Sequence, residues 1–476
     1  MSELLTEAEQ LYKRGYVDEA KERFQNLLQK DPRNKQALNN LGVLAYEENN
    51  SGVAARYFTQ ALEIDPFYKD AILNICDVLR ENGNLNAAGS LLEIAVKEYP
   101  DDTALARLYG ESQYGIIISP REQDFLFNDN EQESPSERVK TLRILQGTYE
   151  IANQSHTISK ALDSQGIICK TLCYYPNYLK YKSDYVIDLA SYKDAREANS
   201  HLMKFAKQLI PQFDVFHFHF GTTLTLDHSD LPALKEAGKK IVTHYWGSDV
   251  RLMSKATEFN PYIKVKGNSE EGIIRDMELM AKYVSHCIVG DEELYQYVKD
   301  YFEHVHIIRA AIDLSKYLPP INKKDNDNFL IVHAPTDSDI KGSAYIQKAV
   351  DELEAEYDFE YRLVKGMSYD EAKRNYAEAD LIVDELHCGS YGLLSIETMA
   401  MEKPVIIWIC DFMREKYPQE LPIISANQDT VKNKIKYALD NRDEIKEIGR
   451  QGRLYVEKYH DMKKIARQLI ELYQEI

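Results

Sequence analysis

Three prolines recur at a fixed interval near the start of the chain, and this period constrains the fold more than any other feature. Pro32, Pro66 and Pro100 are 34 residues apart. Small and large apolar residues keep the same period ahead of each proline, namely Ala20, Ala54 and Ala88, and Phe24, Phe58 and Leu92. Such a period is typical of stacked helix pairs, in which the small and large side chains meet where two antiparallel helices touch.

The repeated segment resembles the tetratricopeptide repeat, whose period is also about 34 residues. Leu41-Gly42 inside one repeat, with Gly15 and Gly83 at turns, completes the match. We therefore predict three tetratricopeptide repeats over residues 1–112. Such arrays usually bind a protein or peptide partner and do no chemistry. Because three repeats are close to the minimum for stability, bracing of the following domain and self-association are alternative roles.

Length and composition limit the remaining choices. The 476 residues suffice for about three domains. The longest apolar run, Pro404 to Cys410, is too short to cross a membrane, and the start MSELLTEAEQ lacks a secretory signal. A net charge of −19 argues against a protein that coats nucleic acid. The six cysteines form no CxxC pair. We expect a cytoplasmic protein with reduced thiols, no transmembrane segment and no nucleic-acid partner.

The pattern changes after the repeats. Residues 121–138, REQDFLFNDNEQESPSER, carry six acids against two bases, which predicts an acidic linker over residues 113–140. From Leu142 onward, short apolar runs alternate with amphipathic helical stretches, as in a βαβ arrangement. We predict an α/β region of two Rossmann-like domains, residues 141–318 and residues 319–476, the second ending in a helical tail. Ligands bind such folds at the carboxyl ends of the strands.

The segment from Ala379 to Ile406 carries the strongest chemical signal. It contains an apolar strand, a glycine-containing loop, a helix that begins near Leu393, and a further strand after Pro404. The free N–H groups at the helix N-terminus suit a phosphate. Glu397, one turn into the helix, is placed to accept hydrogen bonds from neighbouring ribose hydroxyl groups. The alternative is that Glu397 only stabilises the start of its helix.

This segment resembles the donor site of retaining GT-B glycosyltransferases of family 4, which read Glu-Gly-Phe-Gly-Leu, then a helical Glu and Ala-Met-Ala-x-x-x-Pro-Val-Ile. The matching residues are Tyr391, Gly392, Leu393, Glu397, Met399, Ala400, Pro404, Val405 and Ile406. The resemblance implies a GT-B fold and a metal-independent transfer, with retention, of a sugar from a nucleotide-diphosphate donor to a hydroxyl acceptor. The acceptor would belong to a glycan, a lipid-linked glycan, a small molecule or a protein.

Two positions in the second α/β domain depart from the family pattern. The first acid of its Glu pair, which helps to position the sugar, is Gly389 here, and Asp384 and Glu385 at the preceding strand end are candidate replacements. Lys341 resembles the family lysine that neutralises the departing diphosphate. The arginine usually found a few residues before that lysine is missing, so Arg251 and Arg309 are candidates for the missing charge.

The first α/β domain carries a second matching motif. Gly247-Ser248-Asp249 resembles the family sequence His-Gly-Ser-Asp, with Trp246 in place of the histidine. His244 precedes it by two residues, so on a strand both side chains point to the same side. We predict that His244 and Asp249 line the acceptor side of the cleft. A satisfied core histidine is the alternative for His244.

Two patterns suggest metal binding and are discounted. His217 and His219 share a strand face, but no third ligand follows at a standard spacing. Asp337-Ser338-Asp339 fits the Asp-x-Asp pattern of metal-dependent transferases, yet it stands beside Lys341 in a GT-B context. We predict no metal and no cofactor, the nucleotide sugar being a substrate.

Two other functions remain open at this point. Gly389, Trp246 and the missing arginine favour a catalytically weakened scaffold in which the repeats mediate protein interactions. Repeats fused to a GT-B region are also an architecture of O-linked N-acetylglucosamine transferases, which suggests a protein O-glycosyltransferase by analogy.

Overall fold

A computed structural model describes the chain. The described residues are 2–13, 16–48, 50–81, 85–100, 102, 105, 109, 116–117, 142–175, 182–266, 269–319, 328–367 and 369–476. The chain divides into two compact units, Met1–Ile117 and Ile118–Ile476. The predicted acidic linker, apart from Ile116 and Ile117, lies outside the described residues.

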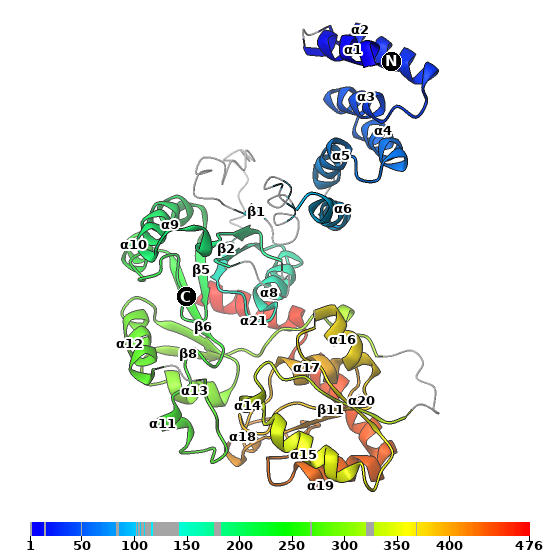
Figure 1. The fold of residues 1–476 in the computed structure, drawn as a ribbon. Helices are drawn as coiled ribbons and strands as arrows, with labels where there is room; N and C mark the ends of the chain where they lie inside the picture. Colours follow the sequence, from blue (N-terminus) through cyan, green and yellow to red (C-terminus); the bar gives the residue numbers. More distant parts are fainter. Residues whose placement is uncertain are drawn as a thin grey trace. The chain divides into compact units, whose positions relative to one another are not determined.

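The first unit is a tetratricopeptide array, as predicted. Its helices pack in antiparallel pairs, and the periodic residues Ala20, Phe24, Ala54 and Phe58 are buried between them (Figure 1). The prolines lie in the turns after every second helix. The helices are α1 (Ser2–Lys13), α2 (Val17–Lys30), α3 (Lys35–Glu47), α4 (Ser51–Ile64), α5 (Lys69–Glu81) and α6 (Leu85–Glu98), and the short strand β1 (Ile116–Ile117) follows.

Gly42 shows why one repeat position lacks a side chain. A Cβ at this position would lie 2.4 Å from Cε1 of Phe58, closer than two carbon atoms approach. The backbone of α3 therefore packs directly against the ring of Phe58 on α4. Only glycine permits this contact, which explains the Leu41-Gly42 pair of the repeat pattern.

The second unit contains two parallel sheets, each with helices on both faces (Figure 1). The strands of the first sheet lie in the order β4-β3-β2-β5-β6-β7-β8, and each pairs with its neighbour in parallel. They are β2 (Arg143–Thr148), β3 (Ile168–Cys173), β4 (Tyr185–Val186), β5 (Val215–His219), β6 (Lys240–Tyr245), β7 (His286–Val289) and β8 (His304–Ile307).

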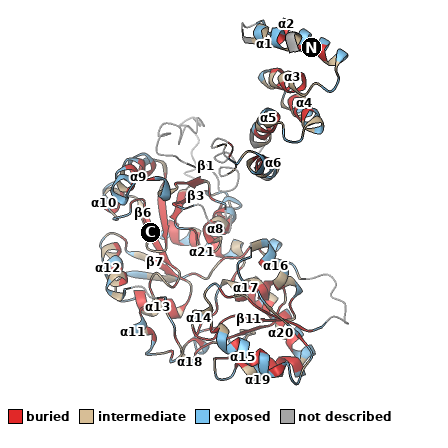
Figure 2. Cartoon of the chain, viewed as in Figure 1, coloured by how far each residue is buried: buried red, intermediate tan, exposed pale blue. Residues whose placement is uncertain are grey.

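Alternating apolar residues build a core on each face of this sheet. Leu145 and Phe216 point to one face, and their neighbours Ile144 and Val215 point to the other. The central strands β2, β5 and β6 are almost wholly buried (Figure 2). The helices of this lobe are α8 (Gln154–Asp163), α9 (Ala195–Leu209), α10 (Leu231–Glu236), α11 (Met253–Ala256), α12 (Glu270–Ala281) and α13 (Glu292–Val298).

The second sheet is also parallel, in the order β10-β9-β11-β12-β13. Its strands are β9 (Leu330–His333), β10 (Glu360–Leu363), β11 (Leu381–Val383), β12 (Val405–Ile407) and β13 (Ile424–Ser425). Its helices are α14 (Ser338–Lys341), α15 (Ser343–Leu353), α16 (Tyr369–Glu378), α17 (Leu393–Ala400), α18 (Asp411–Arg414), α19 (Val431–Asp440) and α20 (Arg442–Tyr459). Two Rossmann-like lobes after an all-helical array are the GT-B arrangement predicted from the sequence.

The last helix, α21 (Met462–Glu475), differs from its predicted place. It packs on the first sheet beside α8, and Tyr473 donates or accepts a hydrogen bond of 2.6 Å with Nδ1 of His217 on β5. Its buried residues Ile465 and Leu469 complete the core of that lobe. The tail therefore belongs in space to the first lobe, although the sequence pattern joins it to the second. Among the described helices, none is long and apolar enough to cross a membrane.

Candidate functional site

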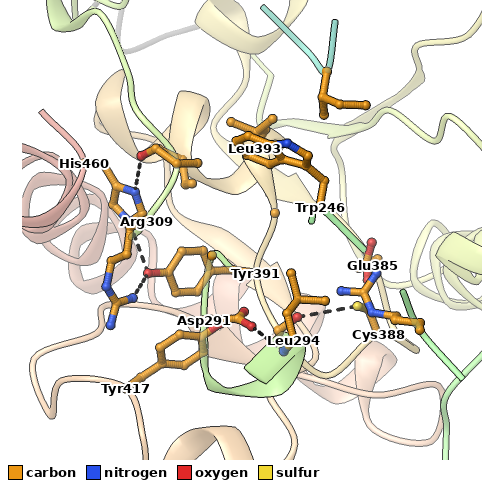
Figure 3. Close-up of a pocket in the computed structure, with 17 residues that line it drawn as sticks. Trp246, Asp291, Leu294, Arg309, Glu385, Cys388, Tyr391, Leu393, Tyr417 and His460 are labelled. Carbon is orange, nitrogen blue, oxygen red and sulfur yellow. Dashed lines mark hydrogen bonds between the residues drawn. The ribbon is translucent and has the colours of Figure 1, made fainter. Parts of the chain in front are cut away.

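A cavity of about 200 Å³ lies between the two lobes (Figure 3). Its walls come from the segments that follow β2, β6, β7 and β8 of the first sheet and β11 of the second. The carboxyl ends of parallel strands are where ligands bind in such folds. The lining residues are Ile151, Trp246, Arg251, Gly290, Asp291, Leu294, Arg309, Ala310, Glu385, Cys388, Ser390, Tyr391, Gly392, Leu393, Ile396, Tyr417 and His460.

The predicted site residues divide into two groups. Glu385, Tyr391, Gly392 and Leu393 line the cavity. The other five do not line it and are held nearby by contacts with other protein groups. They are His244, Asp249, Lys341, Asp384 and Glu397. Trp246 and Arg309, which the sequence offered only as a departure and a candidate charge, are part of the wall. Both follow strand ends, so that position is the signal that could have identified them.

Helix α17 begins at the cavity. Its N-cap residue, Gly392, is exposed and provides no side-chain cap, and no other side chain caps the helix among the described residues. A Cβ on Gly392 would meet nothing within 4 Å. The first N–H groups of an α-helix have no intrahelical acceptor and carry partial positive charge. This end of α17 is therefore open to an anion.

Arg309 supplies a positive charge in the same wall. Its Nη1 donates a hydrogen bond of 2.6 Å to the hydroxyl group of Tyr391, and its guanidinium lies over the rings of Tyr417 and Tyr459. Throughout the described residues no carboxylate forms a salt bridge with it, and Glu292 acts on it only through its charge. A half-buried arginine held on aromatic faces keeps its charge available for a ligand.

Arg251, the other candidate cation, is already neutralised. Its guanidinium pairs with Glu293 through Nε and Nη2, at 3.0 and 2.8 Å, and Glu293 is fully buried. Gly247 makes room for it, because a Cβ there would lie 2.5 Å from Nη1 of Arg251. The bidentate pair shapes the cavity wall but leaves little net charge.

Lys341, which the sequence predicted to neutralise the diphosphate, lies between two carboxylates. Its Nζ lies 2.8 Å from Oδ1 of Asp384 and contacts Oε2 of Glu385. Burial alone would lower the pKa of Lys341, but the two carboxylates raise it above the ordinary value, so the lysine stays charged. One cation between two anions leaves a net negative charge. Ser395 of α17 completes the cluster with a hydrogen bond of 2.7 Å to Asp384.

Glu385 joins this cluster to the cavity. It is only 8% exposed, and its second oxygen, Oε1, is buried without a hydrogen-bond donor in the part of the chain that the structure describes. A buried carboxylate oxygen without a donor costs free energy, on the order of 1–3 kcal/mol.

Glu397 lies one turn into α17, away from the cavity wall. Its Oε1 accepts hydrogen bonds from Tyr369 and Tyr317, at 2.8 and 2.9 Å. Burial raises the pKa of Glu397 to about 7, and the two tyrosine hydroxyl groups oppose that rise. The carboxylate is therefore held by protein donors in one orientation and titrates near neutral pH.

The sequence predicted that His244 lines the cleft, but its side chain does not reach the cavity. It is 1% exposed and lies beneath Trp246, with ring centroids 4.1 Å apart and an interplanar angle of 20°. Trp246 covers it because the two side chains share one strand face and the longer one continues past the strand end. The alternative of a core histidine therefore describes His244 better.

The sequence showed no third ligand at a standard spacing from His217 and His219, but the neighbouring strand places a third histidine beside them. His244 on β6 joins His217 and His219 on β5, and the three rings place ring nitrogens within 4.8 Å of one another. Five of the six nitrogens have protein hydrogen-bond partners, among them Gln146, Tyr473 and the indole N–H of Trp246. The arrangement is a hydrogen-bonded stack, and His244 Nε2 is its one atom without a partner among the described residues.

Asp249 also faces away from the cavity. Its carboxylate accepts hydrogen bonds from the backbone N–H groups of Trp246 and Gly247, at 3.1 and 2.6 Å, and it lines a different hollow beside α12. Its contacts hold the turn that follows β6. Asp337 has a similar local role, because its side chain caps α14 through the N–H groups of Asp339 and Ile340. These contacts account for the Asp-x-Asp pattern.

Family and structure comparisons agree with this architecture. Residues 5–69 and residues 45–111 match the tetratricopeptide repeat family. Sucrose-phosphate synthase from Thermosynechococcus elongatus aligns with 71% of this chain and 99% of its own, at 13% identity and a TM-score of 0.50. HepE from Anabaena, in complex with UDP and glucose, aligns with 70% of this chain and 100% of its own, at 13% identity and a TM-score of 0.51. No curated protein sequence matches the chain.

A mutant O-GlcNAc transferase from Thermobaculum terrenum aligns with 100% of this chain and 96% of its own, at 16% identity. Its TM-score of 0.41 is too low to establish a shared structure over the full length. The two higher-scoring structures establish the GT-B fold of the second unit.

Proposed function

We propose that this chain is a retaining glycosyltransferase of family 4, which moves a sugar from a nucleotide-diphosphate donor to a hydroxyl group. The observation that carries the proposal is the meeting of Arg309 with the open N-terminus of α17 in one cavity between the lobes. A diphosphate needs both a cation and directed N–H donors, and the motif around Gly392 resembles the family's donor site.

In this proposal Arg309 and the N–H groups after Gly392 stabilise the departing diphosphate. Charge develops on the leaving oxygen in the transition state, and donors already held in place stabilise it without reorganisation. The contact with Tyr391 and the rings of Tyr417 and Tyr459 hold the guanidinium ready. Arg309 thus replaces the family arginine that is missing before Lys341, and the acceptor attacks from the face that the diphosphate leaves.

The resemblance to the family assigns Glu397 to the ribose of the donor. Tyr317 and Tyr369 fix the carboxylate through Oε1. Lys341 acts through Glu385 and Asp384, whose orientations its ammonium group holds, since the trio has no positive charge left for a phosphate. Neither a metal nor a cofactor is part of the proposal.

The surroundings of Gly389 explain why the family glutamate is missing at this position. Its φ is +83°, and a Cβ would lie 2.6 Å from Nδ2 of Asn260, which donates to the carbonyl groups of His387 and Cys388. A glutamate does not fit here. Glu385, which lines the cavity, is positioned to take over the task of that glutamate.

The repeats supply a second surface. We propose that the tetratricopeptide unit binds a protein or peptide partner, in keeping with the usual role of such arrays. The acceptor is a hydroxyl group on a glycan, a lipid-linked glycan, a small molecule or a protein, including a protein bound by the repeats.

Thermal stabilisation tests the donor site directly. Purified protein is melted with UDP-, GDP-, ADP-, CMP- and TDP-sugars, alongside Arg309→Met and Glu397→Ala, with Arg450→Met as a surface control. A donor at a hundred times its dissociation constant adds about 2.7 kcal/mol. We expect one nucleotide class to raise Tm in the native chain and in Arg450→Met, and a smaller rise in the two site variants.

A catalytically weakened scaffold is the second candidate. The observation that favours it is Trp246, an aromatic side chain without a transferable proton in the wall where the family has histidine. Folded protein that no donor stabilises would support the scaffold and reject the enzyme.

A further inference from the structure

Trp246 is held in one orientation by the histidine stack. Its indole N–H donates a hydrogen bond of 3.1 Å to Nδ1 of His219, and His219 in turn bonds to Oε1 of Gln146 over 3.0 Å. His244 covers one face of the indole. Trp246 is half-buried, and its side chain lines the cavity.

The stack is rigid because every ring in it is buried. His217 and His219 are fully buried, and their ring centroids are 4.4 Å apart, with Tyr473 of α21 closing the far end. A tryptophan fixed by stacking and by a hydrogen bond loses little conformational entropy when a ligand binds against it.

Glu385 lies in the same wall of the cavity as Trp246, whereas Arg309 and His460 lie at the opposite side (Figure 3). The cavity therefore has a cationic end at Arg309 and an end that contains the indole ring of Trp246 and the carboxylate of Glu385, whose Oε1 is buried without a donor among the described residues. A flat aromatic face takes the C–H surface of a pyranose ring, and a carboxylate oxygen takes its hydroxyl group. A purely apolar ligand would leave Oε1 of Glu385 unsatisfied.

We propose that Trp246 and Glu385 form the subsite for the transferred sugar, which is a pyranose stacked on the indole with one hydroxyl group bonded to the carboxylate of Glu385. His219 and His244 are positioning residues that hold the ring. This inference rests on the proposed function, since the diphosphate at Arg309 and α17 places the sugar toward Trp246 and Glu385.

The test compares a nucleotide sugar with the matching nucleoside diphosphate, because the two ligands share the nucleoside and the diphosphate and differ in the sugar and in the extra charge of the free terminal phosphate. The pair that gives the largest thermal shift is titrated by calorimetry into the native chain, Trp246→Leu, Trp246→Phe and Glu385→Gln. We expect the nucleotide sugar to bind roughly tenfold more weakly to Trp246→Leu and to Glu385→Gln than to the native chain. The affinity of the nucleoside diphosphate should not change. Trp246→Phe keeps a smaller ring and should recover part of the loss.

Binding of the nucleoside diphosphate also shows that each variant is folded. Unchanged binding of the nucleotide sugar to Trp246→Leu and Glu385→Gln would overturn the subsite, as would equal losses for both ligands. Either result leaves the proposed function standing. If the native chain binds neither ligand, the proposed function fails and the subsite fails with it.

Intrinsic fluorescence gives an independent readout. The chain has two tryptophans, Trp246 and Trp408, so Trp408→Phe leaves Trp246 as the only one. We expect the nucleotide sugar to change its emission much more than the diphosphate does. Equal changes with the two ligands would contradict a sugar stacked on the indole.

Discussion

Arg309 and Tyr391 are joined by a hydrogen bond of 2.6 Å between Nη1 and the tyrosine hydroxyl group, and this bond connects the two lobes of the GT-B unit. Arg309 follows β8 of the first sheet, and Tyr391 precedes α17 of the second. Tyr391 also lies 3.1 Å from Nε2 of His460, so the arginine is one part of a buried polar network. Contacts with both lobes thus determine the position of the Arg309 guanidinium, which faces the proposed diphosphate.

Replacing Arg309 should weaken donor binding more than it weakens the fold. Arg309→Met keeps the length of the side chain and removes the charge, so we expect nucleoside diphosphate affinity to fall about 10- to 100-fold. Calorimetric titration measures the change, and Arg450→Met on the exposed face of α20 is the matched control. Native affinity in Arg309→Met would remove this residue from the diphosphate site.

Donor binding should depend on pH through Glu397. Its pKa is raised to about 7 by burial, so the carboxylate becomes protonated as pH falls below 7 and then accepts ribose hydroxyl groups less well. We expect donor affinity to rise with pH through neutrality, by at most about tenfold per pH unit. Glu397→Gln, which does not titrate, should show weak binding and a flatter profile. Identical pH profiles for the two proteins would exclude Glu397 as the titrating group.

The histidine stack should make the protein sensitive to acid. Burial lowers the pKa of His219 to about 3, whereas an unfolded histidine titrates near 6.5. Below pH 6.5 the unfolded chain binds a proton that the folded chain does not, so stability falls as pH falls toward 3. One such group contributes at most about 1.4 kcal/mol per pH unit.

His219→Gln removes that proton from the balance. Urea denaturation between about pH 6 and pH 4.5 should show a shallower loss of stability in the variant than in the native chain. Asp249 and Asp291, whose pKa values burial raises to about 6, give a slope of opposite sign. That slope is common to both proteins and cancels in the comparison. Parallel curves would show that His219 is protonated in the folded state as easily as in the unfolded chain.

Restoring the family acid should not restore the family site. Gly389→Glu puts a side chain on a residue with a φ of +83° and forces its Cβ against Asn260. We expect a loss of about 2 kcal/mol or more in unfolding free energy and no gain in turnover. Gly272→Ala in α12 is the control, since the added Cβ would lie 3.7 Å from its nearest neighbour, the Cβ of Ser269. A stable and more active Gly389→Glu would show that Glu385 does not replace the missing acid.

The proline period and the segment around Gly392 made the architecture predictable, because helix pairs and βαβ units have local patterns that each segment carries by itself. Tyr391, Gly392 and Leu393 could be named as candidates for the same reason, since they belong to one contiguous loop. Lys341 was identified in sequence, but its contacts with Asp384 and Glu385 depend on two adjacent strands of the second sheet. No local pattern reports which charges those strands bring together.

The sequence by itself determined the repeat array, the two Rossmann-like lobes and the loop that opens α17, all through spacing along the chain. Only the tertiary structure decided that His244 joins His217 and His219, that Trp246 covers them, and that α21 returns to the first lobe. It also brought Arg309 to Tyr391 across 82 residues. These contacts arise from strand order and from the packing of one lobe on the other, and the burial that makes them favourable exists only once the chain is folded.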